Sequence, residues 1–429
     1  MRNGCAISLA LIEGSNFGQT SLLKKEKTKE MVSHYIHEDV MVEILVKLPV
    51  KSLLRFKCVS KSWSSLITNP SFIAKHLTNS NKKENGCLFV HSVEPKDANN
   101  FPKKYTFAVC RDKSLTVPVF EYLGLKLNAK VHVMGPCNGI FCLLTNWDSV
   151  ALWNPANRES RALPTQTFPN SIPPRMELER NAFGFGMDPF TGDYKVVSIR
   201  MYSRGSSLDD DIHPSSYPKH IAIYSLRDDS WRDFKGFFPE CSVSSISNFY
   251  TYMDGVYYWS ASNKNHDATK LSFHMGYEVF QNILEQDEPV PFKGIPELGC
   301  PHPGTNLVGH YFGVYNGSLA WIQSYPTHYV APNVFNIWVL KEERWTRELI
   351  AGPFEGAIPL GFWKKGEFLI QVEDGHLYLV DPITLEMKDL RTVASQAIVY
   401  HESLVSVQRR DEEFDHSYIT LRLNFDSFY

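Results

Sequence analysis

The chain has 429 residues, of which 43% are hydrophobic, 13% aromatic and 21% charged. This length exceeds what one compact core usually serves, so a small module beside one large domain is expected. A formal net charge of -3 provides no global field that would attract nucleic acid or an anionic membrane. No apolar stretch approaches the roughly 20 residues that cross a bilayer. Partners must therefore be chosen by local surface features.

Residues 1–32 are predicted to form a disordered tail. The apolar run from Ala6 to Ile12 is already short for a signal peptide, and Glu13 interrupts it. Met31 is an alternative start of translation. The eight cysteines are spread thinly over the chain instead of forming a disulfide scaffold, so we expect reduced thiols. These features favour a cytoplasmic protein, with the nucleus as a second location.

The spacing of apolar residues predicts a first helix in the segment 33–79. Val40, Ile44 and Leu48 recur at four-residue steps, and two acidic residues occupy the first turn, where the helix dipole favours carboxylates. Pro49 stops this helix, because proline lacks the N–H that a helix interior needs.

Two more helices are predicted in the same segment. Val50 opens the second, Ser60 can cap the third, and Asn69 with Pro70 ends the third. Three helices in about 45 residues bury too little apolar surface to be comfortably stable alone. The pattern leaves two interpretations open: a module that docks a partner, or a helical cap on the following domain.

The run from Glu43 to Trp63 closely resembles the F-box of plant F-box proteins. In that family the motif binds the Skp1 subunit, and through it the cullin, of a ubiquitin ligase. The resemblance places the Skp1 contacts on Ile44, Leu45, Leu48, Pro49, Leu53, Val59 and Trp63. The family usually opens with Leu-Pro where this chain has Ile36 and His37, so somewhat weaker docking is expected. Phe56 and Leu66 are expected in the core of the module.

After a polar linker at 80–86, residues 87–409 are predicted to form one large β domain. Short apolar segments flanked by turn residues follow one another, as in 139–144 and 376–380. A strand, a charged turn and a tryptophan recur at Trp231 and Trp345. Radial repetition of four-stranded sheets predicts a β-propeller of six or seven blades. A large β-sandwich is the competing architecture. Residues 410–429 are a C-terminal extension or the last strand.

The large domain also resembles the F-box-associated domain that follows plant F-boxes. Five segments resemble its S-locus F-box branch: 136–139, 153–156, 185–189, 271–280 and 397–406. Members of that branch act in pollen as adaptors that recognise secreted style ribonucleases and direct their ubiquitination. The resemblance therefore implies a non-catalytic adaptor with a protein target, and neither nucleic acid nor membrane as a partner.

We find no convincing catalytic or metal-binding arrangement in the sequence. Cys300, His302 and His310 could supply metal ligands, but their spacing fits no standard zinc pattern. Cys137 and Cys142 flank a turn and are expected to be packing thiols. We therefore predict no catalytic residue, no metal and no cofactor. The alternative functions are an F-box adaptor for an unrelated target and, after it, a propeller lectin or hydrolase with a helical cap.

Three variable segments are the expected target-binding loops: 165–180, 203–219 and 263–268. The second contains the acidic run Asp209 to Asp211, whose charge is suited to a basic partner.

Overall fold

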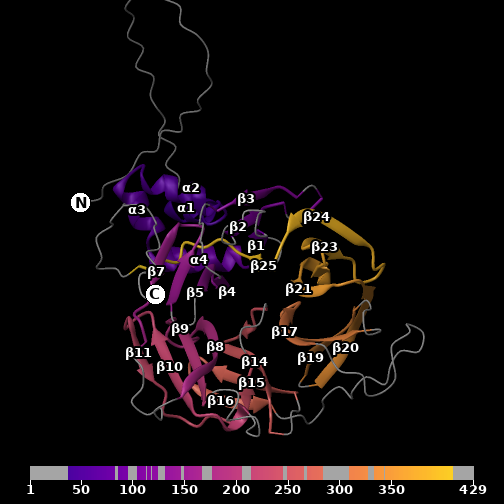
Figure 1. Cartoon of the computed structure of the whole chain (residues 1–429). Coiled ribbons are helices and arrows are strands. Elements are labelled where there is room, and N and C mark those ends of the chain that lie inside the picture. The colour runs from indigo at the N-terminus through magenta and orange to yellow at the C-terminus, as the bar shows by residue number, and fades with distance from the viewer. Residues whose placement is uncertain are drawn as a thin grey trace, which may run out of the picture.

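The computed structural model describes residues 37–82, 86–94, 104–112, 114–116, 118–123, 131–145, 149–166, 176–204, 214–244, 249–264, 268–283, 309–326, 333–342 and 344–408. They form a helical module followed by a ring of six β-sheets (Figure 1). The helices of the module are α1 (Glu38–Leu45), α2 (Val50–Lys57), α3 (Lys61–Ile67) and α4 (Pro70–Ser80).

Local capping signals set the helix ends. The Oγ of Ser60 accepts a hydrogen bond from the backbone N–H of Trp63 at 3.2 Å and caps α3, as predicted. The module has one helix more than the three predicted. Asn69 caps this additional helix, α4, and Pro70 occupies its first position, where a missing N–H does no harm. The same residue pair therefore ends one helix and starts the next.

Each sheet is one antiparallel blade, described here from its inner to its outer strand. Blade 1 contains β25 (Gln396–Tyr400), β1 (Cys87–Glu94), β2 (Lys104–Cys110) and β3 (Phe120–Tyr122). Blade 2 contains β4 (Val131–Cys137), β5 (Ile140–Thr145), β6 (Ser149–Asn154) and β7 (Glu159–Ala162). Blade 3 contains β8 (Glu177–Met187), β9 (Tyr194–Ser203), β10 (Lys219–Ser225) and β11 (Ser230–Asp233).

The remaining blades have the same plan. Blade 4 contains β12 (Ser242–Val243), β13 (Tyr252–Met253), β14 (Val256–Ser262), β15 (Ala268–His274) and β16 (Val279–Ile283), with β12 and β13 both pairing to β14. Blade 5 contains β17 (Gly309–Tyr315), β18 (Ser318–Pro326), β19 (Asn333–Lys341) and β20 (Arg344–Phe354). Blade 6 contains β21 (Ile358–Phe362), β22 (Phe368–Gln371), β23 (His376–Val380) and β24 (Met387–Val393). Two short 3-10 turns span Pro214–Ser216 and Lys364–Gly366.

Contacts between neighbouring blades close the ring. In order, β25 contacts β4, β4 contacts β8, β8 contacts β14, β14 contacts β17, β17 contacts β21, and β21 contacts β25. The pairing of β25 with β1, for example Ala397 opposite Val90, joins residues about 300 positions apart. The fold is therefore a six-bladed β-propeller, as predicted, and not a sandwich. The strand that closes it is β25, whereas residues 410–429 lie outside the described part of the chain.

Apolar clusters fill the spaces between blades. One cluster lies at each of the six blade contacts. Between blades 1 and 2, for example, Phe89 stacks on Phe141 with ring centroids 4.3 Å apart, and Trp153 packs beside them. Burying one such side chain contributes about 2 kcal/mol. Because every blade contributes to two clusters, the blades should unfold together.

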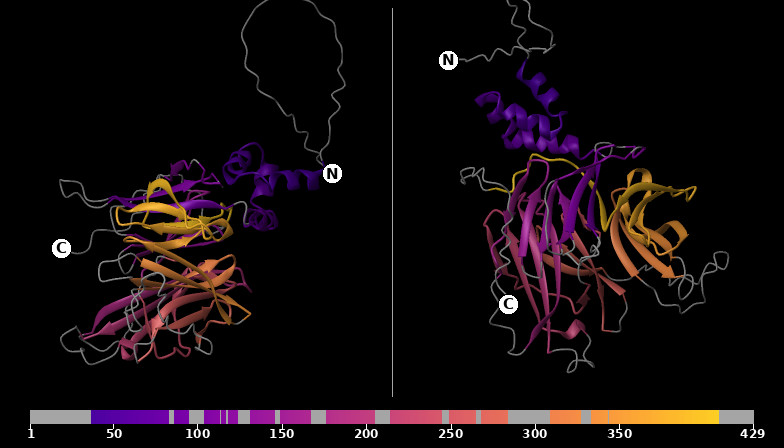
Figure 2. Two further views of the ribbon diagram at one scale, coloured as in Figure 1. Left: turned by 90° about the vertical axis from the view of Figure 1, so that its right-hand side faces the viewer. Right: turned by 45° about the horizontal axis from the view of Figure 1, so that its top comes forward.

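The propeller has two different faces. Tight turns with a positive φ at their first residue, such as Asn138-Gly139, Asp254-Gly255 and Asn316-Gly317, join the first two strands of a blade. The side that carries them is called the helix face, because the helical module attaches there and projects from one side of the ring (Figure 2). Connections between second and third strands, and from one blade to the next, leave from the opposite side, called the loop face.

Candidate functional site

The helical module has apolar side chains on its surface as well as in its core. Val40 is 52% exposed, Ile44 51% and Val59 67%. Pro49 is also exposed. Val40 and Ile44 lie one turn apart on α1 and therefore on the same face of that helix. We call these four residues the exposed apolar set.

The structure divides the seven predicted Skp1 contacts into three groups. Ile44, Pro49 and Val59 belong to the exposed apolar set. Leu48 and Trp63 are half-buried and pack against the core of the module, whereas Leu45 and Leu53 are buried in it. The two buried residues support the exposed apolar set from inside the module. Val40 is not one of the seven predicted contacts. Its position four residues before Ile44 indicates that it lies on the same face of α1.

The core of the module holds the Leu48-Pro49 corner in place. The ring of His76, which is 2% exposed, hydrogen-bonds through Nε2 to the carbonyl oxygen of Leu48 at 3.1 Å. Burial lowers the pKa of His76, so the neutral ring is the stable form at neutral pH. Trp63 meets Phe56 edge-on, with ring centroids 5.1 Å apart. Phe56 and Leu66 lie against the core, as expected.

The first helix begins without the proline that is usual in the resembled family. His37 is its N-cap, and the imidazole Nδ1 accepts a hydrogen bond from the backbone N–H of Asp39 at 3.4 Å. This long contact gives the helix start some of the order that proline would supply.

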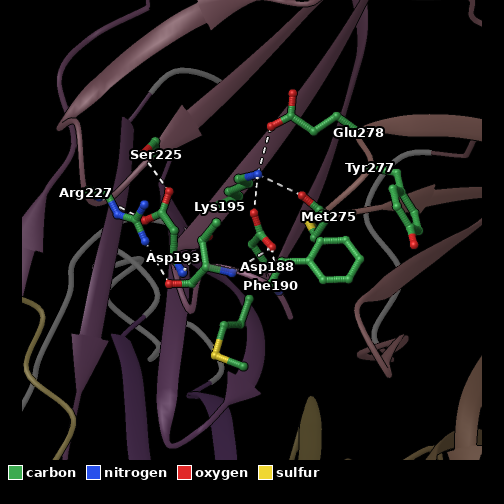
Figure 3. A network of polar contacts seen from close by, with 12 residues as sticks. Asp188, Phe190, Asp193, Lys195, Ser225, Arg227, Met275, Tyr277 and Glu278 are labelled. Carbon is green, nitrogen blue, oxygen red and sulfur yellow. Dashed lines mark hydrogen bonds and ion pairs between the residues drawn. The ribbon is translucent and has the colours of Figure 1, made fainter. Parts of the chain in front are cut away.

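The propeller contains a buried ion-pair network between blades 3 and 4 (Figure 3). The Lys195 ammonium lies 2.9 Å from the Asp188 carboxylate and 2.8 Å from the Glu278 carboxylate. It also donates to the carbonyl oxygen of Met275 at 2.8 Å. Burial alone would raise the pKa of Asp188, but Lys195 and nearby N–H donors outweigh it and lower the pKa to about 2.

This network holds two helix-face turns together, and its charges satisfy one another. It therefore has the properties of a structural element and not of a catalytic one. Next to it, the exposed rings of Phe190 and Tyr277 lie 4.9 Å apart.

No group of three or more potential metal ligands is found within the described ranges. Of the three candidate ligands, Cys300 and His302 lie outside the described residues, and the side chain of His310 is not described. Cys137 and Cys142 are buried free thiols in the apolar cluster between blades 2 and 3, as expected for packing residues. In the part of the chain that the structure covers, no helix has the length and hydropathy to cross a membrane.

A small helical module with exposed apolar residues, followed by a six-bladed propeller, defines the class of F-box proteins with a propeller domain. Residues 36–75 match the F-box domain, and residues 76–416 match the F-box associated beta propeller domain. The chain belongs to this F-box-associated propeller family. An F-box domain implies Skp1 binding within an SCF ubiquitin ligase, and members of the family are in general non-catalytic substrate adaptors.

Plant relatives agree with this assignment. An F-box/kelch-repeat protein of Arabidopsis thaliana is 30% identical over 271 residues, which cover 60% of this chain and 68% of the relative. An F-box protein of the same plant is 25% identical over 394 residues, covering 82% of this chain and 86% of the relative. Among solved structures, TolB from Acinetobacter baumannii is similar over 76% of this chain and 68% of the TolB chain. The TM-score is 0.40 and the sequence identity is 8%.

Proposed function

We propose that this protein is the substrate-recognition adaptor of an SCF ubiquitin ligase, binding Skp1 through the helical module and a target protein through the propeller. The exposed apolar set carries this proposal. A cap that served only the propeller would bury such residues against it, whereas this module packs around a core built mainly by its own helices and presents them to solvent. An apolar surface of this kind is suited to a partner that covers it.

We propose that the chain acts by proximity and catalyses no reaction itself. Binding Skp1 and a target at the same time raises the concentration of target lysines around the ubiquitin-conjugating enzyme. No bond on this chain has to change.

The loop face is the proposed target-binding surface. The three segments singled out from sequence connect β7 to β8, β9 to β10, and β14 to β15. All three connections leave the strands on the loop face, opposite the helical module. The segments themselves lie mainly outside the described residues. This arrangement supports the proposal because the two partners would occupy opposite sides of the adaptor.

We further propose that the target is a basic protein, a secreted-type ribonuclease, and that the adaptor meets it in the cytoplasm, with the nucleus as a second location. The resemblance to the S-locus F-box branch supports the ribonuclease. The acidic run Asp209 to Asp211, which falls between β9 and β10 and outside the described residues, adds a physical reason. A protein that binds RNA carries basic side chains that neutralise phosphates, and an acidic loop attracts such a surface.

Placing a charge at two exposed apolar positions tests the Skp1 site. Replacing Ile44 and Val59 together by Asp should weaken binding of purified Skp1 by at least about 100-fold, because two carboxylates would have to be buried in the interface. Both side chains are exposed, so the fold should survive. Replacing Leu48 would be less informative, since it also packs against the core.

The matched control is Ile383→Asp, since Ile383 is 89% exposed on the propeller. The control should bind Skp1 as tightly as the parent in isothermal titration calorimetry. Unchanged affinity in the double variant, with a native circular dichroism spectrum, would refute the proposed Skp1 site.

Affinity purification from pollen and style extract tests the target. Recovery of a ribonuclease together with Skp1 is the expected result. Replacing Asp209, Asp210 and Asp211 by Asn should reduce ribonuclease recovery and weaken its dependence on salt, while leaving Skp1 recovery unchanged. Recovery of Skp1 without ribonuclease would exclude this target and leave the adaptor proposal standing.

A further inference from the structure

The described chain ends in a segment that joins the propeller to the helical module. Residues 401–408, called the strap, come after β25 and run along blade 2 on the helix face (Figure 1). The side chain of Asn154, which is fully buried, donates to the carbonyl oxygens of Ser403 at 3.0 Å and Val405 at 2.7 Å. Asn157 donates to the same Val405 oxygen at 3.1 Å. Blade 2 thus binds the strap backbone in one position.

Further contacts fix the remainder of the strap. The Glu159 carboxylate accepts hydrogen bonds from the Ser406 hydroxyl at 2.6 Å and the Val407 N–H at 3.0 Å. At Gly139 a Cβ atom would lie 2.5 Å from the Cβ of Ser403, so only glycine allows the strap to approach this turn. Three segments that carried the family resemblance, 136–139, 153–156 and 397–406, therefore meet at one place in the fold.

Two strap residues contact the helical module. Leu404, 7% exposed, is buried in the apolar core formed by the helices, where its neighbours in the cluster include Leu53 and Phe72. The ring of His401 hydrogen-bonds through Nδ1 to the carbonyl oxygen of Ser80, the last residue of α4, at 2.6 Å. Val407 belongs instead to the apolar cluster between blades 2 and 3.

We infer that the strap is a positioning element that fixes the orientation of the F-box relative to the propeller, with Leu404 as its anchor. A single polypeptide connection between α4 and β1 would leave the module free to rotate, because domains joined by one linker move relative to each other by default. The strap supplies a second attachment. It also brings a propeller-bound apolar residue into the core of the module.

This inference rests on the proposed function, because the orientation matters when a target on the loop face must reach the ubiquitin-conjugating enzyme. A rigid connection keeps the effective concentration of target lysines high, whereas a loose one spreads them over a larger volume. Leu404 would then affect ubiquitin transfer while touching neither Skp1 nor the target.

Distance measurements by double electron–electron resonance test the orientation directly. One spin label is placed on α4 through Ala74→Cys, and the other on blade 6 through Glu386→Cys. Both positions are exposed. Cys5, Cys58 and Cys300 are replaced by Ser so that these three positions carry no spin label.

In the Skp1-bound full-length chain we expect one narrow distribution of the distance between the two labels. Leu404→Ala should broaden it at least about two-fold, and Leu404→Met should keep it narrow.

Val407→Ala is the matched control, because it shortens an apolar strap residue that packs only against the propeller. It should leave the distribution narrow. Equal broadening in this control would mean that shortening any apolar strap residue loosens the connection between propeller and module. The specific role of Leu404 would then be refuted. If Leu404→Ala does not fold, His401→Ala provides the same test without opening a core. Narrow distributions in the folded Leu404 and His401 variants would refute the inference.

A ubiquitination assay adds a functional measurement. A lysine-bearing peptide is inserted at 265–267, in the connection from β14 to β15, as a substitute target. Leu404→Ala should lower the initial rate of ubiquitin transfer to this peptide about ten-fold, with the Kd for Skp1 unchanged within about two-fold. An unchanged rate with a broadened distance distribution would refute the positioning role. If the parent chain itself did not bind Skp1, the proposed function would be refuted instead.

Discussion

At the residue scale, similar side chains have different roles because their surroundings differ. Two predicted Skp1 contacts, Leu45 and Leu53, are buried in the core of the module, whereas Ile44 and Val59 are exposed. All four fit the same sequence motif. The lysines show a similar contrast: Lys195 is 9% exposed between two carboxylates, and Lys341 is 50% exposed beside Glu348.

Removing the buried lysine should destabilise the propeller far more than removing the exposed one. Lys195→Met leaves Asp188 in a buried site without its cation and leaves Glu278 paired with Arg232 alone, and we expect a loss of about 3 kcal/mol in the free energy of unfolding. Lys341→Met breaks a surface pair at 2.6 Å and should cost less than about 1 kcal/mol. Urea denaturation at pH 7 measures both. Equal losses would contradict a structural role for the network.

At the scale of elements, side-chain hydrogen bonds supplement the strand pairing where the ring closes. The Gln396 side chain on β25 bridges to β4, accepting from the Val133 N–H at 3.3 Å and donating to its carbonyl oxygen at 3.0 Å. On the other side, the Nδ1 of His91 on β1 bonds to the Gln396 Oε1 at 3.1 Å. The last strand is thereby connected to both neighbouring strands.

This junction should make stability depend on pH. Burial lowers the pKa of His91 to about 4, whereas the unfolded chain protonates near 6.5. The unfolded state therefore binds more protons below pH 6.5, and stability should fall progressively from there to pH 4 by about 3 kcal/mol. His76 and His401, whose pKa values are also lowered, act in the same direction.

Chemical denaturation between pH 4 and 7.5 measures this dependence. His91→Phe should reduce the slope, because phenylalanine can stack on Phe107 as His91 does and cannot be protonated. An unchanged slope in the variant would mean that His91 is not responsible.

At the scale of the whole molecule, the fold depends on the last described segment of the chain. This segment contains β25, which closes the ring, and the strap, which follows it. Without β25, strand β1 loses its inner partner, and the contacts to β4 and β21 disappear. Blade 1 would then face two open apolar clusters.

Two truncations separate the contribution of the closing strand from that of the residues after the strap. A chain ending at Ser395 should fail to fold cooperatively, since both clusters beside blade 1 would be exposed to water. A chain ending at Gln408 keeps β25 and the strap and should melt in one transition, as the parent does. Circular dichroism with thermal unfolding measures both. A single native-like transition in the shorter chain would show that β25 is dispensable.

The sequence by itself determined the elements that depend on local chemistry. Helix ends depend on Pro49, Ser60 and Asn69, and the strands arise from short apolar runs between turn residues. These are interactions between residues a few positions apart, so a pattern reveals them. Resemblance in one short run was also enough to identify the F-box.

Only the tertiary structure decided the features that depend on contacts between distant residues. The blade number was settled by the pairing of β25 with β1, which no local pattern contains. Which apolar residues of the module face solvent depends on its packed core. The contacts of segment 397–406, through Leu404 with the helices and through Ser403 with Gly139, exist only in the folded chain. Burial and close approach are properties of the folded chain, and the spacing of residues along the sequence does not specify them.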